Sequence, residues 1–165
     1  MNPKTLFLVR HAKSSWDSDV PTDHERPLNK RGLHDAPMMG RRLADSGVMP
    51  DLIICSSAAR AQMTARLIAT EIGYEESQIE IITDIYGAGA HGLREIIQGL
   101  DPSLNQIMLV GHNPDITELV NWLSRANIGN IPTCGITTLQ ISSDSWEDFT
   151  AAAAELVQYD FPKRV

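Results

Sequence analysis

The sequence is poor in cysteine and contains no long hydrophobic run. Cys55 and Cys134 are the only cysteines among 165 residues, and they form no C-x-x-C pair. The sequence therefore predicts neither a disulfide framework nor a zinc knuckle, and we interpret both cysteines as buried thiols. The apolar run at residues 6–9 ends at Arg10 and is too short for a secretion signal, and no other run approaches a membrane span. We expect a soluble, cytoplasmic protein with no membrane partner.

The sequence also lacks a Pro/Gly/Ser-rich linker, an internal repeat and a low-complexity segment. Its length suffices for one sizeable hydrophobic core, so we predict a single domain over residues 1–165. Acidic residues outnumber basic ones by 21 to 14, which gives a formal net charge of -7. This balance argues against a broad nucleic-acid-binding surface, and we expect no nucleic-acid partner. A local basic pocket is compatible with it.

Short apolar runs alternate with helical patterns along the chain. Buried strands are predicted at residues 6–9, 52–55, 79–82 and 107–110, with further strands at 136–141 and 155–159. Helices are predicted over residues 29–46, 58–72, 93–100 and 113–125. This alternation predicts a three-layer α/β/α protein in which helices cover both faces of a mainly parallel sheet. One antiparallel strand is expected at an edge of the sheet.

The first predicted helix contains a proline. Asn29 is its N-cap signal and Gly47 its stop signal. Pro37 is expected to kink this helix or to move its start towards Asp35, because proline lacks a backbone N–H. The dipeptide Asn113-Pro114 is the corresponding start signal of the last helix.

Cationic and imidazole side chains follow three of the predicted strands. Arg10 and His11 come after the first strand, Arg60 shortly after the second, and His112 after the fourth. Because the carboxyl ends of parallel strands meet at one edge of a sheet, we expect these side chains to converge. Guanidinium and imidazole groups suit the charge that a transferring phosphoryl group spreads over its oxygens. The arrangement therefore predicts phosphoryl chemistry.

These motifs resemble those of a known family. The segments Leu8-Val9-Arg10-His11-Ala12, Ser56-x-x-x-Arg60-Ala61-x-x-Thr64-Ala65 and Gly111-His112-Asn113-Pro114 resemble the histidine phosphatase superfamily, also called phosphoglycerate mutase-like. Residues 10–17, 26–32 and 160–163 are similar to its bacterial phosphohistidine phosphatase branch, the SixA type. The resemblance spans the chain and implies a phosphoglycerate mutase-like fold.

The resemblance also implies roles for individual residues. His11 would be the nucleophile that takes the phosphoryl group as a phosphohistidine intermediate, which water then hydrolyses without a metal or another cofactor. Arg10, Arg60 and His112 would hold the phosphoryl oxygens, and Ser14 would add a hydrogen bond. The two arginines would disfavour a second positive charge on His11 and so help to keep it in the neutral form that attacks.

Two departures from the family pattern bear on the substrate. Asp17 stands where mutase relatives usually carry asparagine, and a carboxylate there would repel phosphate. Residues 83–87 lack the glutamate that serves as a general acid in many members, and Asp84 is the only alternative acid in that segment. Alkoxide leaving groups depart poorly without an acid, whereas the imidazole of phosphohistidine can take a proton from solvent. We therefore expect a phosphatase of phosphohistidine in a protein.

Two other hypotheses stay open at this point. One is a phosphatase of small phosphomonoesters. The other, from a different class, is a catalytically idle module that binds a phosphoprotein. A trapped, acid-labile phosphoenzyme would separate either enzyme from the binding module.

The remaining motifs carry weaker hypotheses. Residues 87–92 spell the dinucleotide-binding pattern G-x-G-x-x-G, but no acidic residue ends the following strand, so a loop at the rim of the site is favoured. Trp16 is interpreted equally as a lid beside the nucleophile or as a core residue. The basic residues between Arg26 and Arg31 are usually a solvated face, although they could contact an acidic protein. His24, His34 and His91 lack metal-ligand spacing.

Overall fold

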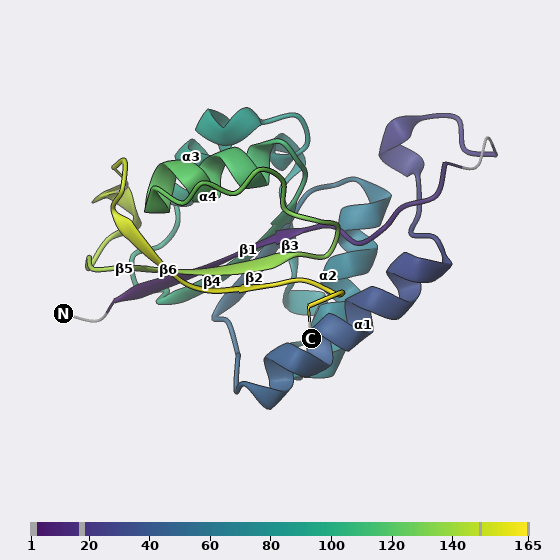
Figure 1. The fold of residues 1–165 in the computed structure, drawn as a ribbon, viewed down its shortest axis with the longest axis horizontal. Coiled ribbons are helices and arrows are strands. Elements are labelled where there is room, and N and C mark those ends of the chain that lie inside the picture. Colours follow the sequence, from purple (N-terminus) through teal and green to yellow (C-terminus); the bar gives the residue numbers. More distant parts are fainter. Residues whose placement is uncertain (1–2, 17–18, 149, 165) are drawn as a thin grey trace.

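A six-stranded sheet runs through the middle of the molecule (Figure 1). The computed structural model describes residues 3–16, 19–148 and 150–164. The strands are β1 (Lys4–Arg10), β2 (Leu52–Cys55), β3 (Glu80–Ile81), β4 (Gln106–Gly111), β5 (Ile136–Ile141) and β6 (Ala154–Asp160). Their order in the sheet is β3-β2-β4-β1-β5-β6.

Helices cover both faces of this sheet, which confirms the predicted three layers. The α-helices are α1 (Lys30–Asp45), α2 (Ala59–Ile72), α3 (Gly89–Gln98) and α4 (Asp115–Ser124). The 3-10 helices are η1 (Asp23–Glu25), η2 (Glu76–Gln78), η3 (Thr83–Ile85) and η4 (Trp146–Asp148). Helices α1 and α2 lie on one face and α3 and α4 on the other (Figure 1), each pair over its own buried apolar cluster. Within the described ranges, no helix is both long enough and apolar enough to cross a membrane.

The sheet is mainly parallel, as predicted, but its antiparallel strand is not at the edge. Strands β1 to β4 pair in parallel, and β5 pairs antiparallel to β1. Strand β6 then pairs antiparallel to β5 and occupies the edge. The single reversed strand is therefore β5, one position inside the sheet, because β6 turns back along it and covers the edge that β5 would otherwise expose.

Several element boundaries differ from the predicted ones. Helix α1 starts at Lys30 and runs through Pro37, so the proline does not move its start towards Asp35. The reason is the N-cap, because the Asn29 side chain accepts a hydrogen bond from the Gly32 amide at 2.9 Å. Strand β3 keeps only two of the four residues predicted for it, and α3 begins four residues earlier than predicted, at Gly89.

The register of the sheet places the three sequence motifs side by side. Arg10 at the end of β1 lies opposite Gly111 at the end of β4, and Cys55 at the end of β2 lies opposite Val110. The pairing continues one residue further, because the His11 amide donates to the Gly111 carbonyl at 3.0 Å. The carboxyl ends of β1, β2 and β4 therefore form one continuous edge, where ligands of such sheets commonly bind.

Candidate active site

His11 lies immediately beyond β1 and is only 7% exposed. Its Nδ1 atom is 2.7 Å from the Ala12 carbonyl oxygen. Because a carbonyl only accepts, Nδ1 carries the ring hydrogen and Nε2 carries the lone pair. Nε2 accepts a hydrogen bond from Arg60 Nε at 3.3 Å. The lone pair of a neutral imidazole thus faces a guanidinium.

Burial is the main reason why His11 stays neutral. Burial first, and then the charges of His112, Arg60 and Arg10, together lower the pKa of His11 to about 3, although the hydrogen bond to the Ala12 carbonyl opposes the shift. The sequence argument attributed this neutrality to the arginines, and their contribution is real but smaller than that of desolvation. Near pH 7 the imidazole is therefore in the form that a nucleophile requires.

Arg60, in the first turn of α2, links His11 to a carboxylate that the sequence analysis did not single out. Its Nη1 atom donates to the Asp23 carbonyl at 2.8 Å and its Nη2 atom to Asp23 Oδ2 at 3.1 Å. Asp23 also accepts from the Tyr86 hydroxyl at 2.6 Å and from Arg26 Nε at 3.0 Å. These donors, the Tyr86 hydroxyl first, hold the pKa of Asp23 well below its usual range. The Asp23 carboxylate is therefore ionised and accepts hydrogen bonds from the side chains of Arg60, Tyr86 and Arg26.

Arg10 and His112 each carry a buried nitrogen without a hydrogen-bond partner among the described residues. For Arg10 it is Nε, whereas its Nη1 donates to the Ile131 carbonyl at 2.8 Å. For His112 it is Nδ1, whereas Nε2 lies 2.8 Å from Ser56 Oγ. When the Ser56 hydroxyl donates to Nε2, the ring hydrogen lies on Nδ1. Unpaired buried donors are costly, and an anion is the partner that satisfies them.

Desolvation also acts on His112. Burial lowers the pKa of His112 to about 4, and the charge of Arg60 adds to the effect. The His11 and His112 ring centroids are 5.2 Å apart. Both imidazoles are therefore neutral near pH 7, His11 with its Nε2 lone pair directed at Arg60 and His112 with Nδ1 available as a donor.

A pocket of about 240 Å³ brings these side chains together. It is lined by Arg10, His11, Lys13, Ser14, Trp16, Arg26, Arg60, His112, Asn113 and Thr133. All five residues that the sequence analysis assigned to the site, the four with catalytic roles and Ser14, are in this set. Its charged side chains are cationic, and no carboxylate lines it within the described part of the chain. The size and charge of the pocket suit a phosphoryl group.

The loop before α1 supplies the outer wall of the pocket. Ser14 Oγ accepts from Arg26 Nη1 at 2.8 Å, so its own hydrogen is left to donate. Arg26 is 8% exposed, which corrects the expectation of a solvated face, although Lys30 and Arg31 are exposed. Trp16 is 78% exposed and therefore not a core residue. Asp17 lies outside the described residues.

The expected acid segment contributes a tyrosine instead of an acid. Asp84 is exposed on η3 and does not line the pocket. Tyr86 lies two residues further on, with its ring edge-on to His112 at a centroid distance of 5.5 Å. Sequence reasoning missed both Tyr86 and Asp23, and the only signal for Asp23 was its position three residues before Arg26 in a proline-bounded loop.

The glycine motif and the remaining histidines do not form further sites. Gly87 and Gly89 have φ values of 77° and 71° and lead into α3. The Gly89 amide donates to Asp115 Oδ2 at 2.9 Å. A carboxylate therefore occupies the helix start where a dinucleotide would place its phosphates. In the ranges that the structure describes, no three His, Cys, Asp or Glu side chains are grouped as metal ligands.

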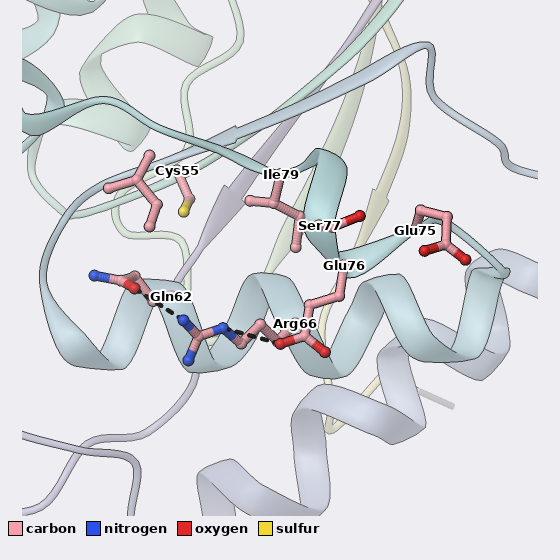
Figure 2. A pocket seen from close by; sticks show the side chains of 8 residues that line it. Cys55, Gln62, Arg66, Glu75, Glu76, Ser77 and Ile79 are labelled. Atoms are coloured by element: carbon pink, nitrogen blue, oxygen red, sulfur yellow. Dashed lines mark hydrogen bonds and ion pairs between the residues drawn. The ribbon is translucent and has the colours of Figure 1, made fainter.

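A larger cavity, of about 520 Å³, lies between α2 and the β3 edge (Figure 2). Its one cationic side chain among the described residues is already engaged, because Arg66 pairs with Glu76 at 3.2 Å and donates to Gln62 at 3.2 Å. Cys55 lines it, but burial raises the pKa of this thiol to about 11, which makes it a poor nucleophile. We therefore place the chemistry in the smaller pocket.

Comparison with known proteins identifies the family. A sequence profile described as histidine phosphatase superfamily (branch 1) matches residues 6–99, more than half of the chain. The chain belongs to the histidine phosphatase superfamily. This confirms the resemblance on which the sequence analysis relied.

Several proteins and solved structures are similar to this chain over most of its length. An uncharacterized chloroplastic protein of Arabidopsis thaliana is 35% identical over 88% of this chain and 70% of its own length. A candidate SixA phosphohistidine phosphatase from Nakamurella multipartitia has a TM-score of 0.83, with 24% identity over 99% of both chains. A second candidate SixA structure, from Agrobacterium tumefaciens, has a TM-score of 0.81, with 26% identity over 98% of this chain and 100% of that one.

Proposed function

We propose that this superfamily member is a phosphatase that uses His11 as a covalent nucleophile. The Nε2 lone pair forms a P–N bond to the substrate phosphorus while the bond from phosphorus to the leaving group breaks. Water then attacks the phosphorylated His11, releases inorganic phosphate and restores the neutral imidazole. The observation that carries this proposal is the fixed tautomer of His11, with Nδ1 held by the Ala12 carbonyl and Nε2 presented to Arg60.

The surrounding donors match the charge of the transferred group. Arg10 Nε and His112 Nδ1 are buried without partners among the described residues, and Arg60 already lies at the nucleophile. We propose that these three side chains hold the phosphoryl oxygens and that Ser14 adds a hydrogen bond. Fixed donors in a desolvated pocket stabilise transition-state charge without reorganisation. No step in this scheme requires a metal, so turnover should persist in EDTA.

We propose phosphohistidine in a protein as the substrate. The support is the state of the nearby carboxylate, because Asp23 is tied to Arg60, Arg26 and the Tyr86 hydroxyl. A carboxylate in this state is a poor proton donor, and an alkoxide leaving group needs one. The imidazole of phosphohistidine instead leaves as a neutral ring once solvent has protonated it.

Two measurements test the proposal together. The first compares turnover of a histidine-phosphorylated protein with that of aryl and alkyl phosphates, and we expect the rate to fall in that order. The second traps the phosphoenzyme, which should be labile in acid. His11→Asn should abolish both, whereas His91→Asn is the matched control because the His91 side chain is 73% exposed on α3.

Each alternative has its own signature in these experiments. Faster turnover of alkyl phosphates than of the phosphohistidine protein would favour the small-phosphoester phosphatase. Retention of the phosphoprotein without turnover would favour the binding module. Turnover by His11→Asn at the wild-type rate would exclude His11 as the nucleophile.

A further inference from the structure

Trp16 is the most exposed large hydrophobic side chain in the described part of the chain, and it lines the pocket that contains His11. Burial of a tryptophan side chain would contribute strongly to the free energy of folding, so the exposure of Trp16 needs a physical explanation. One face of the indole is occupied, because the Arg26 guanidinium stacks on it at 3.7 Å from the ring centroid. With 78% of the residue exposed, the rest of the ring system remains accessible to a ligand.

The support behind Trp16 is rigid. Arg26 donates through Nε to Asp23 Oδ1 at 3.0 Å, and through Nη1 to Ser14 Oγ at 2.8 Å and to the Ser15 carbonyl at 3.0 Å. The Ser15 amide in turn donates to the Pro27 carbonyl at 2.8 Å. The indole therefore rests on a guanidinium that hydrogen bonds hold in place beside the pocket.

The size of the pocket determines which part of a substrate reaches Trp16. A volume of about 240 Å³, already lined by four cationic side chains, is matched to the phosphoryl group. The leaving group must then lie at the mouth, where the exposed tryptophan is. Planar rings stack on indole, and a protonated ring is additionally attracted to its face. The Asp23 carboxylate beside Arg26 offsets the guanidinium charge that would otherwise oppose this attraction.

We propose that Trp16 is a specificity-determining residue, a platform on which a planar nitrogen-heterocyclic leaving group stacks while its phosphoryl group occupies the pocket. This inference rests on the proposed function and names the feature of the substrate that the enzyme selects. The platform favours the phosphorylated imidazole ring in its protonated, cationic form, from which the neutral imidazole departs. It thereby supplies part of the leaving-group assistance for which the pocket has no acid.

The test uses two small substrates that share a P–N bond and differ in the ring. N-phosphoimidazole carries the planar leaving group, and phosphoramidate carries ammonia in its place. The measured quantity is kcat/KM for N-phosphoimidazole divided by kcat/KM for phosphoramidate. Trp16→Ala should lower this ratio about three- to tenfold, and Trp16→Phe should restore most of it. Leu33→Ala removes another exposed apolar side chain, on α1 outside the pocket, and should leave the ratio unchanged.

The outcomes separate the platform from the proposed function. If both P–N substrates turn over and Trp16→Ala leaves the ratio unchanged, the platform is refuted and the phosphatase stands. A general distortion of the loop would lower both rates equally, which also leaves the ratio unchanged and counts against the platform. A loss confined to a histidine-phosphorylated protein would mean that Trp16 contacts the protein and not the ring. If wild type hydrolyses only phosphoesters, the platform and the proposed phosphohistidine substrate both fail, whereas His11 can still be the nucleophile.

Discussion

Replacement of Arg60 by alanine removes the guanidinium that donates to the lone pair of His11. Arg60 donates to His11 Nε2 at 3.3 Å and to Asp23 through its other two guanidinium nitrogens. In the proposed reaction it would also hold a phosphoryl oxygen. Its loss should therefore lower kcat on the order of a thousandfold, which is typical for a fixed charged donor in a desolvated site. Arg60→Lys should recover little, because an ammonium cannot reach two partners as a fork does.

The same substitution should leave the fold nearly intact. The Asp23 side chain is 48% exposed and keeps Arg26 and Tyr86 as partners, so the lost ion pair contributes at most about 1 kcal/mol. The hydrogen bond from Thr64 to residue 60 uses the backbone carbonyl and survives. Alanine also favours the first turn of α2. We expect the midpoint of thermal unfolding to change by only a few degrees.

The assay follows kcat for N-phosphoimidazole at pH 7 in wild type, Arg60→Ala and Arg60→Lys. The matched control is Arg66→Ala, because Arg66 lies on the same helix, its side chain is 49% exposed and it pairs with Glu76. Added guanidinium should partly rescue Arg60→Ala and not His11→Asn. A loss below tenfold, or an equal loss in Arg66→Ala, would refute the role of Arg60 in holding phosphoryl charge.

Two further predictions concern stability. Folding lowers the pKa of His11 from 6.5 to about 3, so the unfolded chain binds this proton first and the free energy of unfolding falls as the pH drops below 6.5. His11→Asn should remove about 3 kcal/mol of the stability difference between pH 7.5 and 4.5 in urea unfolding, and an unchanged difference would contradict the burial argument. Thr64→Val leaves the buried Ala12 amide without its acceptor at 3.0 Å, which should cost about 1–3 kcal/mol. Its thermal midpoint should fall by several degrees, whereas Thr70→Val, at an exposed position of the same helix, should not lower it.

The convergence of the four main site residues could be predicted because it depends on strand direction alone. Arg10, His11 and His112 adjoin strand ends, and Arg60 lies in the first turn after a strand. Parallel pairing places the carboxyl ends of neighbouring strands at the same edge of the sheet, independently of how the connecting loops fold. The signals that carried this prediction are local, namely apolar runs that stop at polar residues.

The part of the site formed by Asp23, Arg26, Trp16 and Tyr86 could not be predicted. The contacts that build it are long-range and leave no local sequence pattern. Asp23 reaches Arg60 across 37 residues and Tyr86 across 63. The loop that carries Asp23 has no periodicity, so nothing in its sequence says that it folds back over α2. The burial of Arg26 and the exposure of Trp16 follow from that same fold and reverse what their residue types suggest.

The environment of Asp23 gives a different physical reason why the site is poorly suited to protonate a leaving group. The sequence argument notes that residues 83–87 lack the glutamate that serves as a general acid and leaves Asp84 as a possible substitute. The structure places the Asp23 carboxylate on the Arg60 guanidinium, which also donates to His11. Hydrogen bonds from Tyr86, Arg26 and Arg60 hold the pKa of Asp23 well below its usual range. A group ionised at every physiological pH cannot protonate a leaving group. We therefore propose that the preference for a leaving group that needs no acid has an electrostatic origin, which lasts as long as Tyr86, Arg26 and Arg60 bind Asp23.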